Sequence, residues 1–200
     1  LDLWAMYLYP GLRLLTKPLI VSSLLLYYIA VAGDHQQPMV MLGLIFALLG
    51  DIFLMFDYPM FFQMGLASFL VMQLCYTFIF RKYKGGLSGR SWSGIAFVIL
   101  VAACFNLIFG DRFGDLRWPV LLYTAAISAM VIAAIYQRNT ILITWGAILF
   151  MVSDLCLAFH KFVAAIPADG LIVMLTYAAA QYVIVKGFLH PFQKPANQKA

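Results

Sequence analysis

Long apolar stretches separated by short polar segments run through this chain from end to end. Seven of the stretches approach the length of about 20 residues that a helix needs to cross a lipid bilayer. Only helices and closed barrels satisfy their backbone hydrogen bonds in lipid, and stretches of this length are typical of helices. We therefore predict an all-α, polytopic membrane helix bundle with spans over residues 18–32, 39–56, 60–80, 92–110, 118–136, 140–159 and 170–189.

One more apolar stretch covers residues 1–16 and is interrupted by Pro10-Gly11. The chain begins at Leu1 without a Met, so we expect this eighth helix to be clipped or broken near its start. Prolines support the other boundaries, because the first turn of a helix tolerates a residue without an N–H. Five of them lie at or near predicted helix starts: Pro18, Pro38, Pro59, Pro119 and Pro167.

Two segments of the chain resemble each other. GLIFALLGDIFLMF begins at Gly43 and GAILFMVSDLCLAF begins at Gly146, and they align without a gap, so that Asp51 matches Asp154. The equivalent spans lie four apart and run in the same direction. We therefore predict one transmembrane domain over residues 1–200, built as a parallel 4+4 repeat with halves of roughly 1–90 and 91–200. Chance similarity between hydrophobic sequences is the alternative, and the matching polar residues argue against it.

The composition excludes several classes of protein. Of the 200 residues, 64% are hydrophobic and 10% are charged, whereas soluble domains are about a quarter charged. This excludes a soluble enzyme, a disordered chain and a nucleic-acid-binding module. All acidic residues are Asp, which excludes glutamate-based zinc and di-iron sites. Because the histidines (His35, His160 and His190) fall in loops or at span ends, we expect no metal site and no cofactor.

Lys and Arg are distributed unevenly between the two sides of the predicted bundle. Eight lie on the side that holds the 81–90 loop and the C-terminal end, and five lie on the other side together with several Asp residues. Cytoplasmic loops carry the excess of Lys and Arg in membrane proteins. We therefore expect a multi-pass protein of the inner (cell) membrane of a bacterium, with its C-terminus in the cytoplasm.

Asp51 and Asp154 lie deep inside apolar stretches. A charged carboxylate there costs at least ~2.5 kcal/mol, so both should face the bundle interior. Because the two helices run in the same direction, the carboxyl groups fall at similar depth in the outer half and can meet. Two facing carboxyl groups in a medium of low dielectric constant do not both ionise readily, so one keeps its proton while the other acts as a base. A hydrogen bond between helices, or an ion pair with Lys17, is the structural alternative.

Further polar residues fall near the same layer of the membrane. Lys17 lies at the outer start of its helix, where a lysine commonly extends toward lipid head groups. Tyrosines near an interface are common, so they carry little weight alone. Ser153 is interpreted as a helix-packing residue. The candidates for substrate binding are Lys17, Gln73, Asn106, Tyr123, Tyr177 and Gln181.

Several of these residues lie in runs that resemble the YhhN family, which includes the transmembrane lysoplasmalogenases. The resemblance spans Lys17 to about Gly187, and members often carry His where this chain has Gln73. It is carried by Lys17-Pro18-Leu19, Gly50-Asp51, the Gly65…Phe69…Gln73…Tyr76 run, GAILFMVSDLCLAFHKF from Gly146 to Phe162, Thr176-Tyr177 and Ala180-Gln181.

The resemblance implies an enzyme that hydrolyses the vinyl-ether bond of lysoplasmalogens, a class of membrane lysophospholipid. The products are a fatty aldehyde and a glycerophospho-ethanolamine or -choline. This reaction needs an acid that protonates the alkene carbon, a group that stabilises an oxocarbenium ion and a base that activates water, and two carboxyl groups can supply all three. We expect Asp51 and Asp154 to be catalytic, in either assignment of acid and base, and Lys17 to hold the lipid phosphate.

A proton- or cation-coupled transporter of small molecules or lipids is the alternative function. A parallel repeat with an intramembrane acidic pair is also typical of such proteins. The absence of helices broken by Gly or Pro in mid-span argues against it. A lipid-binding scaffold without turnover would use the same pocket.

Overall fold

The computed structural model describes residues 10–83, 85–86, 89–137, 139–164 and 169–190. The described part is helical and contains no strand. Its elements are α2 (Pro10–Ala32), η1 (Gly33–His35), α3 (Pro38–Phe53), α4 (Pro59–Lys82), α5 (Gly89–Phe109), η2 (Gly110–Leu116), α6 (Arg117–Tyr136), α7 (Ile141–Phe162) and α8 (Asp169–Leu189).

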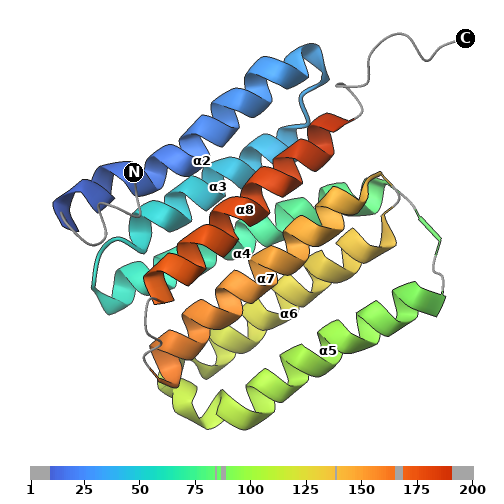
Figure 1. Cartoon of the computed structure of the whole chain (residues 1–200). Helices are drawn as coiled ribbons and strands as arrows, with labels where there is room; N and C mark the ends of the chain where they lie inside the picture. The colour runs from blue at the N-terminus through green and yellow to red at the C-terminus, as the bar shows by residue number, and fades with distance from the viewer. Residues whose placement is uncertain (1–9, 84, 87–88, 138, 165–168, 191–200) are drawn as a thin grey trace, which may run out of the picture.

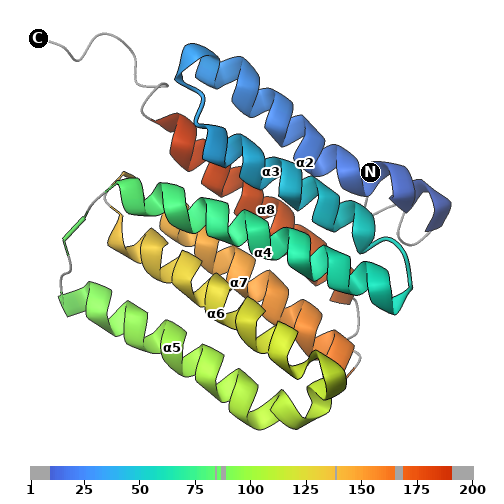
Figure 2. The same cartoon turned by 180° about the vertical axis from the view of Figure 1, so that it is seen from behind.

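The helices lie side by side in one bundle, with α2 at one edge and α5 at the opposite edge (Figures 1 and 2). The closest neighbours are α7 with α8 and α3 with α4, and α4 also packs on α6. Helix α5 packs on α6 and on the short η2 turn that joins them. The end of α3, the start of α4, the end of α7 and the start of α8 therefore meet at one end of the bundle.

The lengths and compositions of the helices support the prediction of a membrane protein. Five described stretches are long and apolar enough to cross a membrane: Pro18–His35, Pro59–Lys82, Ser91–Tyr136, Ile141–Phe162 and Gly170–Leu189. Ser91–Tyr136 contains both α5 and α6, and the shorter α3 is also apolar. The described part of the chain is thus all-helical and contains several membrane-spanning segments.

The first helix differs from the prediction. Residues 10–16 do not form a separate broken helix, because α2 begins at Pro10 and continues without interruption through Pro18. Pro18 therefore lies inside a helix instead of at its start. A proline inside a membrane helix is tolerated because neighbouring groups can satisfy the freed backbone carbonyl. The remainder of the predicted eighth helix, residues 1–9, lies outside the described part.

Other boundaries agree with the proline pattern. Pro38 and Pro59 stand in the first turns of α3 and α4, and Pro119 lies in the first turn of α6. Pro167 lies outside the described residues. Helix α3 ends at Phe53, three residues before the predicted limit, because the chain turns at 54–58 to enter α4. Asp51 consequently lies in the last turn of α3.

Aromatic side chains and two glycines pack the helices together in the half of the bundle that lies away from the end where α3 turns into α4. Tyr76 and Phe80 of α4 stack at 5.9 Å between ring centroids, and Phe80 stacks on Phe188 of α8 at 5.8 Å. A Cβ at Gly43 would lie 2.6 Å from the Tyr76 ring, and one at Gly146 would lie 2.5 Å from Ile184. Glycine at these two positions therefore allows α3 to approach α4 and α7 to approach α8.

Candidate active site

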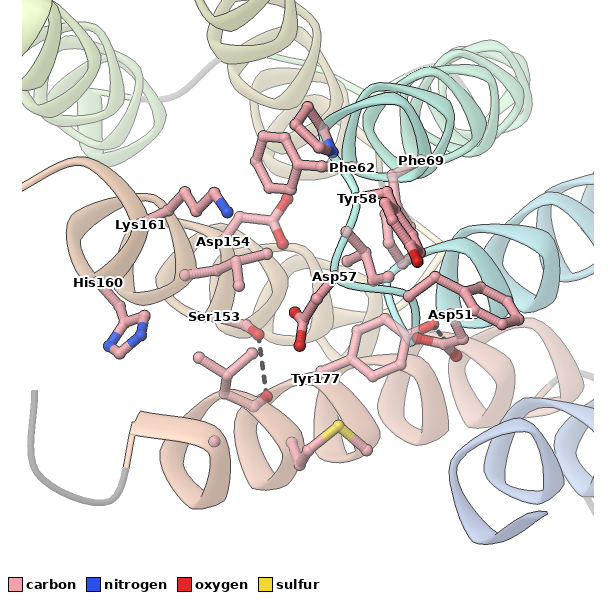
Figure 3. Close-up of a pocket in the computed structure, with 17 residues that line it drawn as sticks. Asp51, Asp57, Tyr58, Phe62, Phe69, Ser153, Asp154, His160, Lys161 and Tyr177 are labelled. Atoms are coloured by element: carbon pink, nitrogen blue, oxygen red, sulfur yellow. Dashed lines mark hydrogen bonds between the residues drawn. The ribbon is translucent and has the colours of Figure 1, made fainter. Parts of the chain in front are cut away.

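A cavity of about 420 Å³ opens at the end of the bundle where α3 turns into α4 and α7 precedes α8 (Figure 3). We call it the main cavity. Its walls combine apolar side chains such as Leu54, Phe62 and Phe69 with an unusual number of polar ones for an apolar chain. The charged and hydroxyl-bearing residues that line it are Asp51, Asp57, Tyr58, Ser153, Asp154, His160, Lys161 and Tyr177.

Asp51 lies on one side of the main cavity and is only 2% exposed. The Tyr177 hydroxyl on α8 donates a hydrogen bond of 2.9 Å to Asp51 Oδ2. The Tyr177 ring is held in turn by Phe69 and Phe150, whose ring centroids both lie 5.8 Å from it. A buried carboxyl group is thus fixed by a donor whose own position is set by aromatic packing.

Asp154 lies on the other side of the same cavity, more than one turn before the end of α7. Its Oδ2 accepts a hydrogen bond from the Tyr123 hydroxyl on α6. Each of the two carboxyl groups therefore has a tyrosine donor from a different helix, and both line one space (Figure 3). This arrangement can present an acid and a base to a single bound molecule.

A narrow apolar space, the apolar slot, adjoins the main cavity. It measures about 40 Å³ and lies between α4, α5, α6 and α7. The slot and the main cavity share Asp154 together with four apolar residues, Leu54, Phe62, Phe69 and Leu157. Asp154 therefore lies at the boundary between a polar and an apolar compartment.

A third space, the lateral groove, lies between α4 and the η2–α6 segment and measures about 600 Å³. It shares Leu66 and Tyr123 with the apolar slot. Trp118 on its rim is 76% exposed. Main cavity, slot and groove thus form a series that leads from the polar end of the bundle to its side.

Gln73 and Gln181 are both fully buried and line none of these three spaces. Gln181 Oε1 accepts a hydrogen bond of 2.9 Å from the Tyr76 hydroxyl, and its Nε2 contacts Met72 Sδ at 3.2 Å. Neither amide atom of Gln73 meets the geometric criteria for a hydrogen bond in the described part of the chain, although its side chain lies beside the Tyr123 hydroxyl. A buried amide that is incompletely hydrogen-bonded costs about 1–3 kcal/mol, which makes Gln73 unusual.

The remaining predicted binding residues are placed differently. Tyr177 lines the main cavity, and Tyr123 lines the slot and the groove. Asn106 donates from Nδ2 to the Ala102 carbonyl of its own helix at 2.9 Å and lines none of the three spaces. Lys17 belongs to α2, and its side chain lies outside the described residues.

Sequence reasoning missed four lining residues: Asp57, Tyr58, His160 and Lys161. In the sequence, His160 stands out only as a histidine in a loop or at a span end, and Lys161 only as one of the positive charges. The spacing of residues in the sequence could have identified Lys161. It follows Asp154 by two helical turns and therefore falls on the same face of α7. Ser153 fulfils the packing role expected of it, because its Oγ donates to the Val173 carbonyl of α8 at 3.0 Å. It also lines the cavity.

The described residues contain no group of three or more His, Cys or Asp side chains that could hold a metal ion. Cys75, Cys104 and Cys156 are free thiols. The chemistry that this part of the chain offers at the main cavity is therefore that of carboxyl, hydroxyl, imidazole and ammonium groups.

These features define a helical membrane protein with a carboxyl-lined cavity that continues into an apolar slot. The chain belongs to the YhhN family, whose model matches residues 12–188. No solved structure matches the chain.

Several relatives carry a functional name. The chain is 30% identical over 154 residues to lysoplasmalogenase TMEM86A of Bos taurus, which covers 72% of this chain and 62% of the relative. It is 30% identical over 173 residues to lysoplasmalogenase TMEM86B of Sus scrofa, with 85% and 72% covered. It is also 30% identical over 144 residues to a lysoplasmalogenase of Mycobacterium tuberculosis, with 70% and 55% covered. The chain thus spans less than two thirds of the bovine and mycobacterial relatives.

Proposed function

We propose that this protein is a membrane-embedded lysoplasmalogenase, which hydrolyses the vinyl-ether bond of a lysoplasmalogen with Asp51 and Asp154. Relatives named lysoplasmalogenase support the reaction class. The observation that carries the proposal is that Asp154 borders both the main cavity and the apolar slot, while Asp51 lines the same cavity. The vinyl-ether bond joins the polar glycerol to the hydrocarbon chain, so it belongs at such a boundary.

In this mechanism one carboxyl group acts as the acid and the other as the base. Protonated Asp154, next to the slot, donates its proton to the second carbon of the alkenyl chain, and the first carbon becomes an oxocarbenium ion bonded to the glycerol oxygen. Ionised Asp51 stabilises this cation and takes a proton from the water that attacks the first carbon. The resulting hemiacetal transfers its hydroxyl proton to the glycerol oxygen as the C–O bond breaks, which releases a fatty aldehyde and a glycerophospho-choline or -ethanolamine. Proton return from Asp51 to Asp154, through water, restores both groups.

Two tyrosines orient the carboxyl groups. Tyr123 and Tyr177 each donate a hydrogen bond to one oxygen of a carboxyl group and so fix the orientation of that group. Because the donors come from α6 and α8, the two carboxyl groups are oriented by different parts of the bundle.

The hydrocarbon chain of the substrate would pass through the slot and leave the protein through the lateral groove. The slot itself is too small for a fatty chain, but Leu66 and Tyr123 connect it to the larger groove. Passage of the chain would require the side chains that line the slot to move apart. A lysophospholipid can then enter sideways from the membrane, with its head group at the main cavity.

Two further proposals concern the architecture. The parallel 4+4 repeat of an eight-helix bundle is supported by equivalent packing in α3–α4 and α7–α8, because Gly43 faces Tyr76 while Gly146 faces Ile184. Tyr76 and Ile184 are separated by the same interval as Gln73 and Gln181. An inner-membrane location with a cytoplasmic C-terminus follows from the Lys and Arg distribution, and it puts the main cavity at the outer side.

The test is aldehyde release from lysoplasmenyl-choline or -ethanolamine by the purified protein in detergent. In D₂O, the proposed mechanism puts one deuterium on the second carbon of the aldehyde, which mass spectrometry detects. A wild-type protein that is folded but releases no aldehyde would contradict the proposal. The transporter alternative, which no relative named above supports, would instead require a sealed liposome to show any activity.

A further inference from the structure

The mouth of the main cavity carries an ammonium group without an ionic partner. Lys161 lies in the last turn of α7, is exposed and lines the cavity. Its Nζ lies 5.0 Å from the centroid of the Phe62 ring on α4. No carboxylate forms a salt bridge with it in the described part of the chain. Lys161 is thus held near an aromatic face with its charge free to bind an anion.

A carboxylate lies in the same mouth. Asp57 belongs to the turn between α3 and α4, is exposed and lines the cavity. Its side chain points into the cavity in Figure 3. Among the described residues it makes no hydrogen bond or salt bridge, including with Lys161. The aromatic side chain of Tyr58, which is 67% exposed, lines the cavity beside it.

Opposite charges that share one mouth without pairing favour a ligand that carries both charges. A purely anionic head group would be attracted by Lys161 but repelled by Asp57. A purely cationic head group would be attracted by Asp57 but repelled by Lys161. We propose that Lys161 binds the phosphate and Asp57, with the Tyr58 ring, binds the amine of a zwitterionic phospho-amine head group. This inference rests on the proposed function and deepens it, because it assigns recognition of the head group to particular residues of the same cavity.

The assignment differs from the one expected from the sequence, in which Lys17 holds the phosphate. Lys161 follows Asp154 by two helical turns, so phosphate and reacting bond would lie along one face of α7. The glycerol carbons of a lysophospholipid separate its phosphate from its ether oxygen. A binding site and a reacting site along one helix suit that separation.

Binding of lipids that cannot be hydrolysed tests this inference separately from catalysis. The probes are three saturated 1-O-hexadecyl ethers of glycerol that carry phosphocholine, phosphate alone or no head group, because a saturated ether has no alkene carbon to protonate. Free phosphocholine is the fourth probe and distinguishes recognition of a lipid from recognition of the soluble head group. Calorimetry with the full chain in detergent gives Kd for the wild type, Lys161→Gln and Asp57→Asn.

The wild type should bind the phosphocholine lipid most tightly, and free phosphocholine more weakly. Lys161→Gln should weaken both phosphate-bearing lipids by about two- to fivefold, as expected for exposed charge pairs, without affecting the lipid that lacks a head group. Asp57→Asn should weaken binding of the phosphocholine lipid and of free phosphocholine, and it should tighten binding of the lipid with phosphate alone. Lys161→Arg should retain phosphate binding.

Asp111→Asn and Arg117→Gln are matched controls, since both residues are exposed on the η2–α6 segment and pair with each other instead of lining the main cavity. Neither should alter head-group preference. Equal effects of Asp57→Asn on all the lipids, or none on any, would overturn the inference. If the wild type releases no aldehyde but binds the four probes in the expected order, the proposed reaction is overturned and this binding mode is not.

Discussion

Tyr177 on α8 donates a hydrogen bond of 2.9 Å to Asp51 on α3, a residue 126 positions earlier in the chain. The contact connects the two halves of the chain at the floor of the main cavity. Asp154 has its own donor in Tyr123, 31 positions away. The two carboxyl groups that the sequence singles out are thus oriented by helices that the sequence alone does not pair with them.

Replacing either carboxyl group by an amide should abolish turnover. Asp51→Asn and Asp154→Asn remove the base and the acid of the proposed mechanism, so each should lower the rate of aldehyde release at least 100-fold, the order expected for general acid–base catalysis. Asp111→Asn, whose side chain is 97% exposed, is the control and should behave as wild type. Activity retained in both variants would exclude the mechanism.

Removing the Tyr177 hydroxyl should have a smaller effect than removing Asp51. Tyr177→Phe keeps the ring between Phe69 and Phe150 but loses the hydrogen bond, at a cost of about 1 kcal/mol in stability. We expect kcat to fall with little change in KM, because the carboxyl group loses its orientation. Tyr182→Phe on the same helix, where the side chain is 47% exposed, should change neither. An unchanged kcat in Tyr177→Phe would show that Asp51 needs no such support.

Replacing Gln73 by an apolar residue should stabilise the protein but lower its activity. Gln73→Leu replaces a buried, incompletely hydrogen-bonded amide by an apolar side chain, so the melting temperature in detergent should rise. Aldehyde release should fall, because the Gln73 side chain interacts with Tyr123, which donates the hydrogen bond to Asp154. A variant that is both more stable and fully active would assign Gln73 no role in the reaction.

Filling the apolar slot should change the preference for chain length. Ala158→Phe puts a ring into the slot between α4 and α7. KM for long-chain lysoplasmalogens should rise, while that for very short alkenyl chains should change less. Leu100→Phe on α5, at a position that is 59% exposed, is the control for the added volume. If both substrates lose affinity equally, the chain follows another route.

The two packing glycines, Gly43 and Gly146, should differ from Gly110, where an added Cβ would meet open space. Gly146→Ala brings a Cβ within 3.0 Å of the backbone of α8, and Gly43→Ala meets the Tyr76 ring. Overpacking of this kind costs about 1–3 kcal/mol, and it should be larger at Gly146, where the backbone cannot rotate away. Gly110→Ala, with nothing within 4 Å, should leave the melting temperature unchanged or raised.

The sequence by itself determined the class of fold and the two carboxyl groups. Apolar stretches of membrane length can form little else than helices, so their existence and most of their starts follow from local composition and proline. The cost of a carboxylate in an apolar helix makes Asp51 and Asp154 stand out without any knowledge of their neighbours. Helix α2 is the exception, because it continues through Pro18 although proline usually marks a helix start.

Tertiary structure alone decided which side chains meet. Asp57 and Lys161 look like ordinary loop and interface charges in the sequence, yet the α3–α4 turn and the end of α7 bring them to one cavity. Asn106, which falls at a suitable depth, turns back to its own helix. Depth along a helix is a local property of the sequence. The rotation of each helix about its axis and its choice of neighbours depend on packing between distant segments, which no local pattern contains.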